Sequence, residues 1–93
     1  MMEQKATSKG YILVDADNQN EYIEKITRTN SGLSLMICHQ PEDAMLFQYP
    51  HEALTWGAIV NLSNKEQGYP SATFKVMKLL TVLEDIEEGK END

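Results

Sequence analysis

Residues 51–64 form the segment that most restricts how this chain can fold, because they are apolar almost all the way round a helix. Pro50 precedes them and suits a first helical turn, where its missing N–H has no partner to lose, and Glu52 lies near the positive end of the helix dipole. At helical spacing the apolar residues fall into one stripe of Ala53, Trp56, Gly57 and Val60 and a second of Leu54, Ala58 and Leu62, with Ile59 on the far side. A chain of 93 residues buries only about two-thirds of its unfolded surface. One face of this helix is therefore expected to pack on a sheet, and the other needs separate cover.

Three segments ahead of the helix predict an antiparallel meander. Residues 11–16 are apolar on both alternating sets, which is typical of a strand inside a sheet. Residues 21–28 alternate poorly and carry several charges, which indicates an edge strand. Residues 33–39 alternate cleanly, as expected for a strand with one core-facing side. The polar residues 17–20 and the Asn-Ser-Gly sequence at 30–32 predict the two turns.

The remaining elements complete an α+β fold of β-β-β-α-β order. Pro41 and the acids after it predict a short helical turn over residues 42–47, with Ala44 and Phe47 pointing inward. Residues 72–86 have both helical and alternating apolar spacing, so periodicity leaves helix and strand open. Their β-branched and aromatic residues favour a C-terminal strand, and the helix is expected to cross over one face of the sheet.

The chain is expected to hold one domain, residues 11–86, between a flexible leader at 1–10 and a disordered acidic tail at 87–93. Of the net charge of −7, −5 lies in positions 84–93, which hold six acids and one lysine, and −2 in the rest of the chain. A terminal run of this kind is typical of a solvated tail. The scattered basic residues argue against direct binding of nucleic acid.

Cysteine usage and hydropathy indicate a cytoplasmic protein. Cys38 is the single cysteine and cannot close an intramolecular disulfide, whereas small secreted domains usually carry several pairs. No stretch approaches the roughly 18 apolar residues that a membrane-spanning helix requires. Neither a membrane partner nor export is therefore expected.

Motifs for metal binding are incomplete. Asp15, Asp17 and Gln19 have the spacing of a calcium loop, but Asn20 and Ile26 stand where that loop requires glycine and a bidentate glutamate. The pattern therefore predicts a turn with incidental acids. With one cysteine in the chain, a structural zinc set is not expected either.

Catalytic motifs are equally weak. A Cys38 nucleophile with His39 or His51 as its base is the one enzymatic alternative. A lone cysteine in an alternating strand is more typical of a small buried hydrophobe. No catalytic, cofactor or metal residue is predicted, and the chain is not expected to be an enzyme.

The sequence resembles small accessory proteins of Gram-positive phages and prophages. The resemblance rests on GYIL at 10–13, EYI at 21–23, PEDAMLF at 41–47 and HEA at 51–53, and it covers roughly residues 10 to 62. It implies an accessory cytoplasmic protein and transfers no functional residue.

The apolar surplus around the helix suggests a non-enzymatic protein–protein interaction module that binds another protein or a second copy of itself, with a homodimer as one form. Aromatic and methionine side chains are common both in interfaces and in cores, so core packing is the alternative for several candidates. The predicted interface comprises Met45, Phe47, Tyr49, Leu54, Trp56, Ala58, Ile59 and Leu62. The alternative function is an acidic inhibitor of a nucleic-acid enzyme, acting through the tail and Glu42, Asp43 and Glu52.

Overall fold

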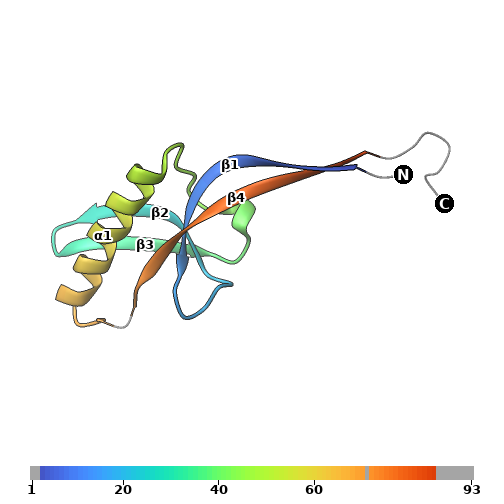
Figure 1. Cartoon of the computed structure of the whole chain (residues 1–93). Helices are drawn as coiled ribbons and strands as arrows, with labels where there is room; N and C mark the ends of the chain where they lie inside the picture. The colour runs from blue at the N-terminus through green and yellow to red at the C-terminus, as the bar shows by residue number, and fades with distance from the viewer. Residues whose placement is uncertain (1–2, 71, 86–93) are drawn as a thin grey trace.

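A computed structural model describes residues 3–70 and 72–85 as a four-stranded antiparallel sheet with one α-helix (Figure 1). The elements in chain order are β1 (Glu3–Asp15), β2 (Tyr22–Thr29), β3 (Gly32–Cys38), the 3-10 turn η1 (Pro41–Asp43), α1 (Pro50–Glu66) and β4 (Phe74–Asp85). The strands lie in the order β3-β2-β1-β4, which confirms the α+β class and the β-β-β-α-β order. The strand expected near the C-terminal end is β4, and the helical alternative there is wrong.

β1 begins at Glu3, so the prediction of a flexible leader is wrong for residues 3–10. Its ladder with β4 runs from Glu3 opposite Asp85 to Asp15 opposite Phe74. These first residues lack an apolar alternation of their own, and they form a strand because β4 supplies a partner. The predicted acidic tail at 87–93 lies outside the described residues.

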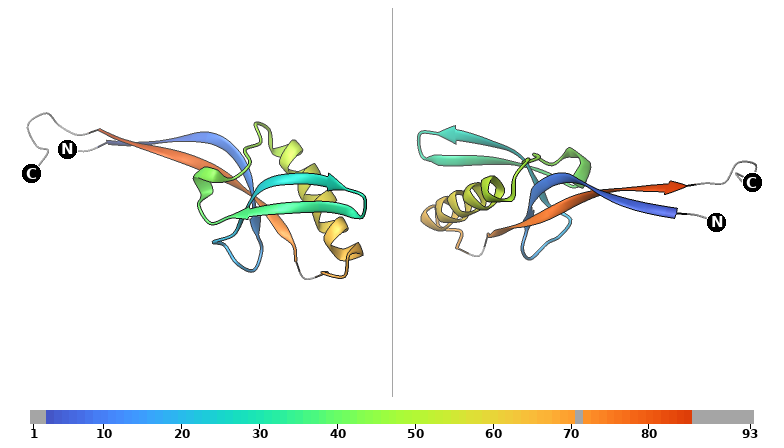
Figure 2. Two further views of the ribbon diagram at one scale, coloured as in Figure 1. Left: turned by 180° about the vertical axis from the view of Figure 1, so that it is seen from behind. Right: turned by 45° about the horizontal axis from the view of Figure 1, so that its top comes forward.

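The outer halves of β1 and β4 form a two-stranded ribbon that leaves the body of the molecule (Figures 1 and 2). The principal-axis extents of 58 × 25 × 20 Å reflect this elongated shape. Two-stranded ribbons are marginally stable in water on their own. The ribbon therefore depends on its continuity with the body of the sheet.

A bulge in β1 marks the place where the ribbon joins the body. The register with β4 shifts between Ser8 and Gly10, and Gly10 has a φ of +140°. A Cβ atom at Gly10 would lie 2.6 Å from the carbonyl oxygen of Phe47. Next to the bulge, Tyr11 and Phe47 exchange two backbone hydrogen bonds of 2.8 Å. Glycine is thus required here because the chain leading into α1 pairs closely with β1 at this point.

β2 lies inside the sheet between β3 and β1, so the prediction of an edge strand is wrong. Its ladder with β3 extends along the whole strand, whereas its Cα register with β1 consists of Val14 opposite Tyr22. One residue farther along, Met45 donates its backbone N–H to the carbonyl of Ile23 at 2.9 Å. The charged residues of β2 are compatible with an internal position because β1 diverges from most of this strand.

The core lies between α1 and one face of the sheet. It is built from six buried side chains: Leu13, Ile23, Phe47, Ala53, Val60 and Phe74. Gly57 permits the close approach of helix and sheet, since a Cβ atom there would lie 3.2 Å from Cδ2 of Leu13. Three of the four residues of the predicted stripe, Ala53, Gly57 and Val60, form the buried face of α1, whereas the fourth, Trp56, is exposed.

Candidate interaction surface

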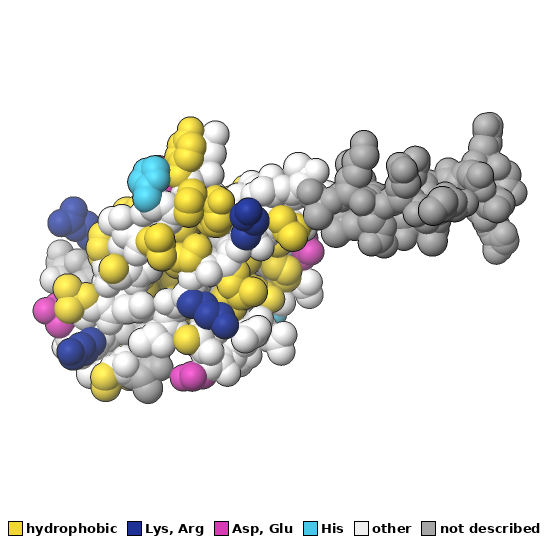
Figure 3. Space-filling model, viewed as in Figure 1, with side chains coloured by type: hydrophobic (Ala, Val, Ile, Leu, Met, Phe, Trp, Pro, Cys, Tyr) yellow, Lys and Arg dark blue, Asp and Glu magenta, His cyan; other side chains and the backbone are white. Residues whose placement is uncertain are grey.

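The face of α1 that points away from the sheet is apolar and exposed. Leu54, Ile59 and Leu62 are 60%, 42% and 58% exposed, and Ala58 between them is exposed as well. Leu54, Ala58 and Leu62 recur every four residues and so follow one line along the helix. Figure 3 views the molecule from the helix side and shows hydrophobic side chains in several groups over this face. We call these four residues the outer stripe of α1.

Trp56 lies beside the outer stripe, on the flank of α1 that faces β3. It shares this flank with Ser63 and Gln67 by helical spacing, and the Gln67 amide donates to the carbonyl of Leu33 at 3.4 Å and to Ser63 Oγ at 2.9 Å. Trp56 remains 41% exposed. The stripe that the sequence predicts around Trp56 is therefore only partly buried.

The segment before α1 divides the predicted interface residues between core and surface. Phe47 is only 9% exposed and belongs to the core, so the structure does not place it in the predicted interface. Its backbone pairing with β1 holds it inward. Met45 is half-buried against the core, whereas Tyr49 is 50% exposed and stacks on His51 with ring centroids 5.6 Å apart. Leu46, which the sequence reasoning omitted, is 49% exposed.

The opposite flank of α1 is attached to the start of β4 by two asparagine side chains. Asn61 donates from Nδ2 to the carbonyl of Phe74 at 3.1 Å and accepts from the Phe74 N–H at 2.8 Å. Asn64 donates to the carbonyl of Ala72 at 2.9 Å. The sequence reasoning missed both residues, although a polar side chain at the margin of an apolar stripe is a signal for such a contact.

Cys38 does not have the surroundings of a nucleophile. The thiol is buried and donates to the carbonyl of Gln40 at 3.4 Å. Burial raises the pKa of the Cys38 thiol, and the nearby charges of Glu24 and Asp43 raise it further. Reactive cysteines have a lowered pKa, because the thiolate is the attacking species.

The predicted turn at Asp15 is a tight polar turn. Asp15 Oδ1 accepts from the backbone N–H groups of Asp17 and Asn18 at 2.8 and 2.9 Å. Its carboxylate thus satisfies the backbone of its own loop. No cluster of three or more potential metal ligands occurs among the described residues.

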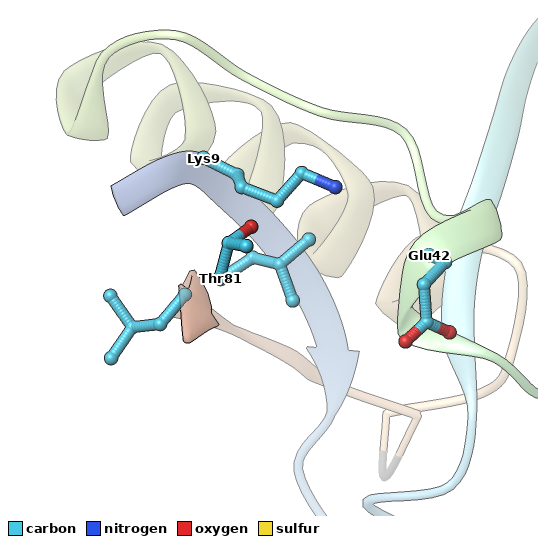
Figure 4. Close-up of a pocket in the computed structure, with 5 residues that line it drawn as sticks. Lys9, Glu42 and Thr81 are labelled. Carbon is cyan, nitrogen blue, oxygen red and sulfur yellow. The ribbon is translucent and has the colours of Figure 1, made fainter. Parts of the chain in front are cut away.

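A shallow hollow of about 250 Å³ lies at the base of the ribbon (Figure 4). It is lined by Lys9, Glu42, Leu79, Leu80 and Thr81. This lining combines one cation, one carboxylate and one hydroxyl with two leucines. It contains no histidine or cysteine that could form a nucleophile–base pair, so the outer stripe of α1 is the stronger candidate site.

The three acids of the inhibitor hypothesis lie on two elements. Glu42 and Asp43 belong to η1 and Glu52 to the first turn of α1, and all three are exposed.

Among the described helices, none is long and apolar enough to cross a membrane.

Comparison of the chain with models of protein families, with curated proteins and with solved structures finds no match. The resemblance to phage accessory proteins stays a prediction.

Proposed function

We propose that this protein is a non-enzymatic interaction module whose outer stripe on α1 binds an amphipathic helix of another protein. The observation that carries the proposal is the exposure of Leu54 and Leu62, 60% and 58%, at opposite ends of a continuous apolar line. Large apolar side chains gathered in one place on a small domain are typical of a binding surface.

The shape of the outer stripe favours a helix as the occupant. Ala58 lies midway between Leu54 and Leu62, so the stripe has a shallow centre between two larger side chains. Helices pack at axial distances of about 8–10 Å when small residues or interleaved ridges meet at the contact. An apolar helix laid along this line would place its own side chains on either side of Ala58.

Charges at the C-terminal end of the outer stripe indicate the orientation of the partner. Glu66 continues the four-residue spacing of Leu54, Ala58 and Leu62, and Lys65 precedes it in the last turn of α1. A partner helix with lysine or arginine opposite Glu66 would complement this arrangement. Such charges contribute more to orientation and association rate than to affinity.

The test is selection of binders from a displayed library of helical peptides with randomised apolar and charged positions. We expect the selected peptides to carry an apolar stripe, and Leu62→Glu to weaken their binding at least about tenfold, because it places a charge within the desolvated contact. Met36→Glu is the matched control, since Met36 is similarly exposed at 52% but lies on β3. Selected peptides that bind the wild type and both variants equally would refute the proposal.

We further infer a cytoplasmic accessory role in a phage or prophage. The support is the sequence resemblance over residues 10 to 62 and the single cysteine. Genomic neighbourhood tests this inference, because adjacent phage genes would support it and a metabolic operon would contradict it.

A further inference from the structure

The outer edge of β4 is a second surface, independent of α1. β4 is the last strand in the order β3-β2-β1-β4, so one of its edges has no neighbouring strand among the described residues. At its start this edge is occupied, because Asn61 bonds both the N–H and the carbonyl of Phe74. The Asn61 side chain thus forms the two hydrogen bonds with Phe74 that a neighbouring strand would otherwise form.

The contact with Asn61 also identifies which backbone groups of β4 point outward. In an antiparallel ladder, outward-pointing residues alternate with those bonded to the neighbouring strand. The extra residue of the β1–β4 bulge lies in β1, so the alternation in β4 continues unbroken from Phe74. Val76, Lys78 and Leu80 therefore direct their N–H and carbonyl groups away from β1, and positions 82 and 84 follow.

Apart from Lys75 and Lys78, this edge lacks the features by which proteins usually protect exposed strands. β4 is 12 residues long and contains no proline, and its regular spacing has no bulge of its own. Met77 and Leu80 on it are 40% and 49% exposed. Among residues 75–81, no backbone hydrogen bond extends beyond the strand ladder.

We propose that a second copy of this chain pairs antiparallel with β4 about a two-fold axis at Thr81, so that two sheets join into one of eight strands. The order of charges along β4 supports this occupant, because Lys75 and Lys78 lie in its first half and Glu84 and Asp85 at its end. Antiparallel self-pairing brings the basic half of one copy beside the acidic end of the other. Pairing would also turn the marginal two-stranded ribbon into four strands.

The register about Thr81 is selected by the residues that it places opposite one another. It sets Lys78 against position 84, a glutamate, and Leu80 against position 82, a valine. Opposite charges and β-branched or apolar pairs at such positions stabilise a sheet, whereas like charges destabilise it. The neighbouring register, centred on Leu80, would instead set Val76 against the same glutamate.

Cross-linking tests the proposed axis. Facing residues of a non-hydrogen-bonded pair lie about 4.5 Å apart at Cα, within the range of a disulfide. We expect Thr81→Cys to form a covalent dimer in air, and Lys75→Cys, exposed on the same strand, to remain reduced. Equal cross-linking of the two variants, or cross-linking through Leu80→Cys in place of Thr81→Cys, would overturn the axis at Thr81.

Sedimentation of the full chain tests the charge pairing. We expect a concentration-dependent dimer whose dissociation constant rises roughly tenfold in Lys78→Glu, because two like-charge pairs then replace two opposite ones. The double variant Lys78→Glu/Glu84→Lys restores opposite charges and should recover dimerisation. A wild-type chain that stays monomeric at about 100 µM overturns the proposal, as does a dimer that Leu62→Glu dissociates and Lys78→Glu leaves intact.

This inference uses a different surface from the proposed function, and the two can fail separately. Peptide binding that responds to Leu62→Glu in a chain that never dimerises would leave the α1 proposal standing alone. Dimers that respond to Lys78→Glu without any helical binder of α1 would leave only the pairing of β4.

Discussion

Replacing Gly10 by alanine should destabilise the fold by about 3 kcal/mol. The φ of +140° at Gly10 is a conformation that other residues adopt at a cost of about 1–3 kcal/mol. The new Cβ would lie 2.6 Å from the Phe47 carbonyl oxygen, so the two backbone bonds between Tyr11 and Phe47 must lengthen or break. Each such bond contributes about 0.5–1.5 kcal/mol. Alanine also has less conformational freedom than glycine in the unfolded chain, which offsets about 0.4–1 kcal/mol of this loss of stability.

Gly68→Ala is the matched control for this substitution. Gly68 also has a positive φ, +96°, but a Cβ atom there would meet nothing within 4 Å. We expect it to cost about 1 kcal/mol from backbone strain alone. Urea unfolding followed by circular dichroism measures the free energy of unfolding of both variants. In thermal unfolding of a domain of this size, a loss of 1 kcal/mol lowers Tm by about 4–8 °C. A Gly10→Ala variant no less stable than Gly68→Ala would refute the close pairing of the Phe47 segment with β1.

Three further substitutions and one labelling reaction test other parts of the structure. Asn61→Ala should lower the free energy of unfolding in urea by about 1–3 kcal/mol, because it removes both hydrogen bonds to the Phe74 backbone. An unchanged urea midpoint would show that these two hydrogen bonds do not stabilise the fold. Val60→Ala should lower the free energy of unfolding by about 2 kcal/mol, since Val60 is fully buried. Leu62 is 58% exposed, so Leu62→Ala should change the same quantity by less than about 0.5 kcal/mol. Equal losses of stability in the two variants would contradict the assigned faces of α1. Cys38 should react with a disulfide reagent at pH 8 far more slowly in the folded chain than in urea, because its pKa is raised by burial. Because the pKa of the Cys38 thiol is higher in the folded chain, the free energy of unfolding should fall as the pH rises above the ordinary thiol pKa, where the unfolded chain deprotonates first. Rapid labelling of the folded chain would contradict the raised pKa.

The parts of the fold that the sequence predicts well are those where side-chain patterning is local. In β3, Leu33, Leu35 and Ile37 are half-buried against the core while Ser34 and Met36 are exposed, which is the predicted alternation. The parts that it missed depend on partners distant in sequence. Residues 3–10 become a strand only through β4, and the internal position of β2 follows from how β1 crosses it.

The candidate site shows the same division. Exposure of Leu54, Ile59 and Leu62 agrees with the prediction that one helix face remains uncovered, because a single small sheet can cover only one side of α1. The burial of Phe47 could not be predicted from its neighbours in sequence, since it results from backbone pairing with Tyr11. The contact between Asn61 and Phe74 likewise requires knowing that β4 begins beside α1.

The ladder between β1 and β4 also determines the order in which the molecule can fold. Its paired residues are far apart along the chain, from 59 positions for Asp15 and Phe74 to 82 for Glu3 and Asp85. Loop closure over such distances is entropically costly and slows folding. The β2–β3 hairpin closes over a short turn and is expected to form early, whereas β1, one of the two inner strands, pairs with β4, the last of the described strands, only later. A nascent chain that has not yet released β4 would therefore expose an unfinished sheet.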